Sequence, residues 1–67
     1  MELSARNQLK GKVKTVKTGA IMAEVVVDVG GSEIVAEITK GSVERMKIQS
    51  GDAVTVIVKS TEVMLGK

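Results

Sequence analysis

The segment from Ile21 to Gly31 constrains the fold more than any other part of the chain. Its apolar residues recur at every second position, which is the period of a half-buried β-strand: Ile21, Ala23, Val25, Val27 and Val29. Gly30-Gly31 then predicts a tight hairpin, because the favoured two-residue turns need positive φ at one or both central residues, which glycine adopts readily. Ser32–Thr39 reads as the returning strand. The centre of the chain is therefore predicted to be an antiparallel hairpin.

The rest of the chain predicts three more strands and one short helix. The strands are expected over Gln8–Lys17, Ala53–Lys59 and, briefly, Val63–Leu65. Gly11 indicates a bulge or bend within the first strand, and Thr18-Gly19 a turn after it.

Ser42 can cap a helix over residues 43–46, although Thr39 could cap one that starts slightly earlier. Three strands, a helix and two strands form the element order of a mostly β, OB-like five-stranded barrel with its helix between strands 3 and 4. From the residues alone, an open antiparallel meander with one helix is also compatible with the pattern.

Composition favours a small domain that associates with copies of itself. The 67 residues allow one domain, and such a chain buries only about 60% of its unfolded surface. It has no Cys, His or aromatic residue, so disulfides and large aromatic anchors are excluded and a zinc site is not expected. Yet 43% of the residues are hydrophobic. Met22, Met46 and Met64 are expected to fill the core.

Both ends of the chain place a cation beside small hydroxyl residues. The first end reads Ser4-Ala5-Arg6-Asn7-Gln8, and the second reads Lys59-Ser60-Thr61. Arginine offers a fixed fork of donors, lysine a compact charge, and hydroxyl groups fill the remaining lone-pair directions of an oxyanion. This is the chemistry of holding an anion without transforming it. We expect Asn7 to be a structural hydrogen-bonding residue.

The same motifs resemble the molbindin family, the small molybdate- and tungstate-binding Mop proteins. The resemblance covers nearly the whole chain and would make residues 1–67 a single Mop domain. Its most specific block is the opening one, and its blocks follow the family's order: residues 4–11, Ala23-Glu24-Val25, Thr39 with Ser42-Val43-Glu44, and residues 58–64. The resemblance implies the OB-like fold and a hexamer with oxyanion sites between subunits.

The resemblance also assigns residues to these sites. One subunit would contribute Ser4, Ala5, Arg6, Lys59 and Ser60, and a neighbouring subunit would contribute Thr39 and Ser42. Arg6 and Lys59 would then roughly balance a dianion. A second oxyanion site near a threefold axis would use the turn Lys17-Thr18-Gly19-Ala20. Neither site has direct ligands for a metal cation.

The leading functional hypothesis is an intracellular store or buffer for molybdate or tungstate, without a catalytic cofactor. An OB-type nucleic-acid-binding module is the alternative, supported by Lys10, Lys12, Lys14 and Lys17 but opposed by the absence of aromatic rings for base stacking. A structural assembly module without a ligand is a third hypothesis. An enzyme is not expected, because no nucleophile–base pair is visible. The polar N-terminus and the absence of a long apolar span predict a cytoplasmic protein without a membrane partner.

Overall fold

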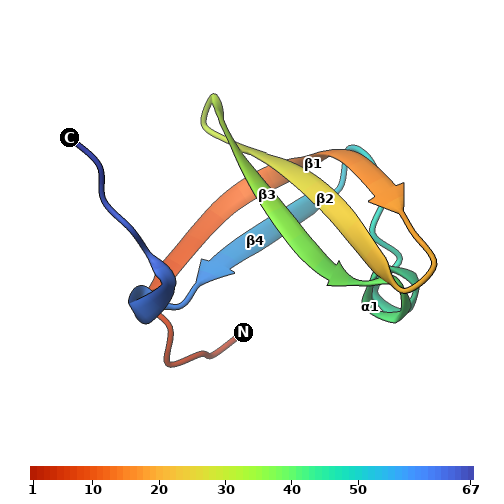
Figure 1. The fold of residues 1–67 in the computed structure, drawn as a ribbon, viewed down its shortest axis with the longest axis horizontal. Coiled ribbons are helices and arrows are strands. Elements are labelled where there is room, and N and C mark those ends of the chain that lie inside the picture. Colours follow the sequence, from red (N-terminus) through yellow and green to blue (C-terminus); the bar gives the residue numbers. More distant parts are fainter.

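The computed structural model covers residues 1–67 and shows a curved four-stranded antiparallel sheet with one short helix (Figure 1). The elements in chain order are β1 Asn7–Thr18, β2 Met22–Val29, β3 Ser32–Thr39, α1 Lys40–Met46, β4 Ala53–Val58 and the 3-10 helix η1 Ser60–Glu62. The strand order across the sheet is β3-β2-β1-β4. No helix in the structure is both long enough and apolar enough to cross a membrane.

The hairpin between β2 and β3 confirms the prediction from residue alternation. Gly30 and Gly31 have φ values of 65° and 94°, the left-handed conformations that glycine adopts at little cost. The backbone N–H of Gly31 also donates to the Asp28 carboxylate over 2.9 Å. The two strands then pair without interruption, from Val29 opposite Ser32 to Met22 opposite Thr39.

The helix α1 begins one turn earlier than a Ser42 cap would place it. Thr39 is the N-cap, and its hydroxyl oxygen accepts from the backbone N–H of Ser42 over 3.0 Å. The helix ends at Met46, and the C-cap residue Lys47 has a left-handed φ of 53°. The sequence is compatible with two starting points for this helix, and the structure shows the earlier one, in which Thr39 is the N-cap.

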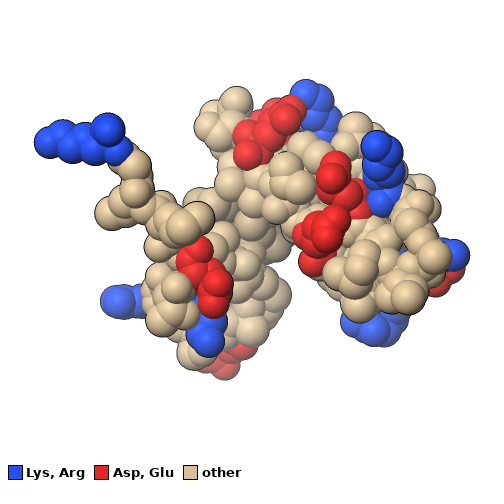
Figure 2. All heavy atoms as spheres, in the orientation of Figure 1, with Lys and Arg blue, Asp and Glu red and all other residues tan.

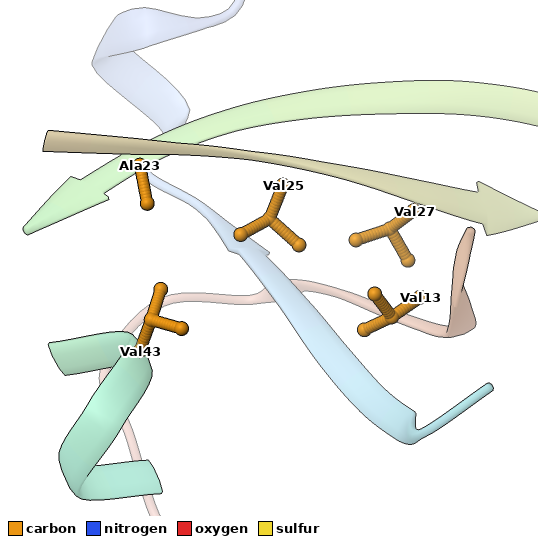
Figure 3. Packing of buried hydrophobic residues seen from close by; sticks show 5 residues of the cluster. All are labelled: Val13, Ala23, Val25, Val27 and Val43. Carbon is orange, nitrogen blue, oxygen red and sulfur yellow. The ribbon is translucent and has the colours of Figure 1, made fainter. Parts of the chain in front are cut away.

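The core extends along one face of β2, from Val43 of α1 beside Ala23 to Val13 of β1 beside Val27 (Figure 3). Four valines and one alanine are its only buried residues: Val13 from β1, Ala23, Val25 and Val27 from β2, and Val43 from α1. Alternation along β2 sends its three core residues to one face, as the sequence predicts. The methionines are not core residues, since Met22, Met46 and Met64 are 41%, 60% and 92% exposed. A core this small leaves most of their apolar surface uncovered within one chain.

The long strand β1 pairs with β2 along its second half and with β4 along its first. Its irregularity lies at Lys14, where the register with β2 shifts between Val13 and Thr15, and not at Gly11 as expected. Gly11 instead allows a close backbone approach. A Cβ atom there would lie 2.6 Å from the Asp28 carbonyl oxygen and 2.7 Å from the Val27 Cγ1 atom.

The expectation of a fifth strand that closes a barrel is wrong for this chain. The residues after β4 form η1, and Val63–Leu65 is neither helix nor strand. The C-terminal tail runs away from the sheet in Figure 1, and Met64 and Leu65 are 92% and 95% exposed. A strand is stable only with a partner edge, and the turn at η1 carries this segment away from the edges of its own sheet. The OB-like arrangement is therefore open.

An apolar groove occupies the open side of the sheet. We define it by its lining, of which 11 of 14 residues are hydrophobic: Met1, Val25, Val27, Ala36, Ile38, Ser42, Met46, Ile48, Asp52, Ala53, Val54, Thr55, Val56 and Ile57. Figure 2 shows the molecule hollowed between the end that carries α1 and the end that carries η1. A groove of this kind is rare on the surface of a soluble monomer unless something binds there.

The contact at Gly11 gives a test of the sheet. Replacing Gly11 by alanine should lower the free energy of unfolding by about 1–3 kcal/mol, because the new methyl group overlaps a backbone oxygen that cannot move aside. Chemical denaturation at one fixed protein concentration measures this free energy of unfolding. Gly41→Ala is the matched control, since no atom lies within 4 Å of the added carbon and alanine favours a helix. Equal stability of Gly11→Ala and the natural protein would contradict the close approach.

Candidate functional site

The pairing of β1 with β4 brings the two ends of the chain into one pocket. Asn7, the first residue of β1, lies opposite Val58, the last residue of β4. The residues just outside these strands then line a shared pocket: Ser4, Ala5, Arg6, Asn7, Lys59 and Ser60. The structure thus brings together all five of the residues that sequence analysis assigns to one subunit's part of the site.

Hydrogen bonds fix the backbone on both sides of this pocket. The Asn7 side chain donates to the Val58 carbonyl over 3.1 Å, which ties the start of β1 to the end of β4. The Gln8 side chain donates to the Ala5 carbonyl over 2.7 Å and shapes the segment before β1. On the other side, the Glu62 backbone N–H donates to the Lys59 carbonyl over 2.9 Å. Asn7 therefore has the structural role expected of it, and it also lines the pocket.

The pocket is rich in donors and carries positive charge. Arg6 and Lys59 form no ion pair, since the one salt bridge in the structure joins Lys14 and Glu33 elsewhere. No carboxylate lines the pocket. The backbone N–H groups of Ala5 and Arg6 donate no hydrogen bond within the chain. Free cations, hydroxyl groups and free N–H groups around one space form an environment that favours an anion.

The residues of this pocket are not the carboxylate, imidazole or thiolate ligands that metal cations usually take in proteins. The structure contains no group of three or more Asp and Glu side chains that could hold a metal ion. The pKa of Lys14 is raised because its ammonium group donates a hydrogen bond to the negatively charged Glu33. That residue lies outside the pocket. The donors and positive charges of this pocket are suited to holding an anion.

Thr39 and Ser42 lie far from this pocket within one chain. They sit at the start of α1, which is at the opposite end of the molecule from η1 in Figure 1. Their hydroxyl oxygens are 2.8 Å apart, and the Arg45 Nη2 atom lies 3.5 Å from the Ser42 oxygen. Ser42 also stands on the wall of the apolar groove. Arg45 was not predicted, although its spacing of three residues from Ser42 is the helical signal for such a contact.

The turn Lys17–Ala20 forms no pocket in the single chain. It comprises the last two residues of β1 and the first two that follow that strand, and the backbone N–H of Gly19 donates to the Met22 carbonyl over 2.7 Å. That N–H group is therefore already engaged. Lys17 lies opposite Glu24 in the strand register.

A family model matches almost the entire chain. The TOBE domain model matches residues 3–65. Among curated proteins, molybdenum-pterin-binding protein 1 of Clostridium pasteurianum is 48% identical over 66 residues, which are 97% of this chain and 97% of that protein.

Solved structures agree with this match. The structure of a molybdate-binding protein from Sporomusa ovata has a TM-score of 0.95 and 43% identity, with both chains fully covered. The cytoplasmic molybdate-binding protein ModG, solved with molybdate bound, has a TM-score of 0.85 and 41% identity over 90% of this chain and 43% of that one. The agreement in sequence, length and fold shows that this chain belongs to the TOBE domain family and, within it, to the small molbindin (Mop) proteins.

Proposed function

We propose that this protein binds molybdate or tungstate and serves as an intracellular store or buffer for the anion. The observation that carries the proposal is the pocket at the chain ends, where Arg6 and Lys59 stand unpaired beside Ser4 and Ser60. Proteins similar in sequence and fold are described as binding molybdate or molybdenum-pterin, and one of them as cytoplasmic. These similarities support a cytoplasmic binding protein without catalytic activity.

The chemistry of the pocket fits a tetrahedral dianion. Arg6 and Lys59 would offset its two charges, which is necessary because an uncompensated buried charge costs many kcal/mol. The hydroxyl groups of Ser4 and Ser60, together with the free N–H groups of Ala5 and Arg6, would donate to its oxygens. Because the set consists mainly of donors, it favours an anion that carries no proton of its own. The possible second site at Lys17–Ala20 stays a prediction that needs neighbouring subunits.

Removal of one cation tests the pocket directly. The Lys59→Ala variant should bind molybdate about 10- to 100-fold more weakly, through loss of a charge-assisted contact of roughly 1.5–3 kcal/mol. Isothermal titration calorimetry measures this, with Lys12→Ala as a control that removes a charge outside the pocket. Sulfate should bind more weakly than molybdate, because fixed donors fit the smaller ion poorly. Equal affinity for the two anions, or no effect of Lys59→Ala, would count against the assignment.

We also propose that the site is completed by a second copy of the chain, in an oligomer that the family resemblance suggests is a hexamer. The apolar groove and the exposed tail support this. Leu65 and Met64 would be covered if the tail of one copy entered the groove of another. Three residues of extended chain span at most about 11 Å, which limits the distance from Ser60 to Val63. A tail whose Val63 lay beside Ser42 of the other copy would therefore bring Ser60 near that serine. Thr39 and Ser42 would then face Arg6 and Lys59.

Assembly and binding should therefore depend on each other. The Leu65→Lys variant should dissociate more readily and bind molybdate at least about tenfold more weakly, because a charge cannot replace a buried leucine in an apolar groove. Molybdate should stabilise the natural oligomer by about 2.7 kcal/mol per site at a hundredfold excess over the dissociation constant. Sedimentation across a dilution series, with and without molybdate, measures both, and Lys67→Gln is the control. A monomer that binds molybdate with full affinity would refute the shared site.

The alternative of nucleic-acid binding has little support in the distribution of charge. Lys14 pairs with Glu33, and Lys12 and Lys17 lie opposite Asp28 and Glu24 in the strand register. Figure 2 accordingly shows acidic and basic atoms interspersed on the face it displays. A continuous basic surface, which phosphate backbones require, is not formed by this lysine stretch.

Single-stranded oligonucleotides should accordingly fail to bind at near-physiological salt. Fluorescence anisotropy of labelled DNA and RNA in about 0.15 M salt measures this, because weaker non-specific attraction is screened under those conditions. A low-salt titration is the control for that attraction. Micromolar binding that persists at about 0.15 M salt would favour the nucleic-acid module over the oxyanion store.

A further inference from the structure

Arg45 is a cation outside the chain-end pocket that lies within hydrogen-bond distance of Ser42, a residue assigned to the oxyanion site. Its Nη2 atom lies 3.5 Å from the Ser42 hydroxyl oxygen. The guanidinium forms no ion pair, because the one salt bridge of the structure joins Lys14 and Glu33. Arg45 is exposed and lies in the last turn of α1, so it has no part in the core. Its guanidinium group therefore has no ion-pair partner within the chain and lies beside Ser42.

The contact also determines what the Ser42 hydroxyl can do. Its oxygen accepts from the Thr39 hydroxyl over 2.8 Å and faces the Arg45 donor. Thr39 in turn accepts from the Ser42 backbone N–H over 3.0 Å. A serine oxygen has two acceptor lone pairs and one hydrogen. With both lone pairs facing donors, the hydrogen of Ser42 is left to donate outward.

We propose that Arg45 is a further specificity-determining residue of the oxyanion site, which supplies a third positive charge beside Ser42 and favours doubly charged over singly charged tetrahedral anions. This inference rests on the proposed function, in which Ser42 contacts the anion. Arg6 and Lys59 alone would balance a dianion, so a third cation gives the occupied site a net positive charge. The third charge raises the affinity for dianions relative to the affinities for monoanions and neutral molecules.

The charge and the orienting contact of Arg45 predict different effects on different anions. Coulomb energy scales with the product of the charges, so Arg45 attracts a dianion twice as strongly as a monoanion at the same distance. Orientation of the Ser42 hydroxyl would instead aid both anions alike. Molybdate and perrhenate are tetrahedral oxyanions of similar size that carry two charges and one charge, respectively. The ratio of their affinities therefore isolates the charge of Arg45.

The test is a set of calorimetric titrations of the intact oligomer with molybdate, and with perrhenate by displacement of molybdate. In Arg45→Gln, molybdate should bind about tenfold more weakly and perrhenate about threefold more weakly, so that the affinity ratio falls about threefold. Arg45→Lys restores the charge and should keep the natural ratio within about twofold. Lys47→Gln removes a charge that follows the same helix and should leave the ratio unchanged. Thermal unfolding verifies that each variant is folded.

The outcomes separate this inference from the proposed function. A natural protein that binds molybdate, together with an Arg45→Gln variant of unchanged affinity ratio, overturns the role of Arg45 and leaves the proposed function standing. An equal fall of the ratio in Lys47→Gln also overturns it, because a general field effect would then suffice. A natural protein that binds neither anion overturns the proposed function and this inference together.

Discussion

The pairing of β1 with β4 is the interaction on which the rest of the structure depends. It joins Asn7 to Val58 across the two ends of the sequence, and the pocket residues lie immediately outside that junction. At the other end of β4, Val13 donates to the Asp52 carbonyl over 2.9 Å and accepts from the Gly51 N–H over 2.8 Å. A sheet without this pairing would retain the β2–β3 hairpin and lose the pocket at the chain ends.

Local features were predictable from the sequence, and features that depend on a distant partner were not. Alternation along β2 and the Gly30-Gly31 turn are properties of neighbouring residues, so strand and hairpin followed from them directly. The bulge at Lys14 depends on the register with β2, and the space at Gly11 depends on the Asp28 carbonyl. Val63–Leu65 has the composition of a strand, but a strand also needs an edge to pair with, which the sequence does not locate.

The residues of the candidate site also divide into those that the sequence predicts and those that depend on distant parts of the chain. The cation–hydroxyl motifs at the chain ends are short and could be found in the sequence, and strand pairing then brought them together. Thr39 and Ser42 came from the family resemblance, and the single chain holds them at the opposite end of the molecule. Arg45 was missed because its contact with Ser42 requires α1 to include both residues, and the start of the helix was undetermined. The residue types in a sequence show which interactions a side chain can form. The contacts that it does form depend on where its helix or strand begins.

The sheet has two free edges, and they differ in chemistry. The β3 edge carries Glu33 and Glu37, whereas Ala53–Val58 of β4 contains no charged residue. Two β3 edges that met would place glutamates from both chains close together, which disfavours edge-to-edge pairing and the aggregation that follows from it. The β4 edge has no such protection and is the one that can accept an added strand. Fibre growth by pairing of sheet edges is therefore opposed at the β3 edge and not at the β4 edge.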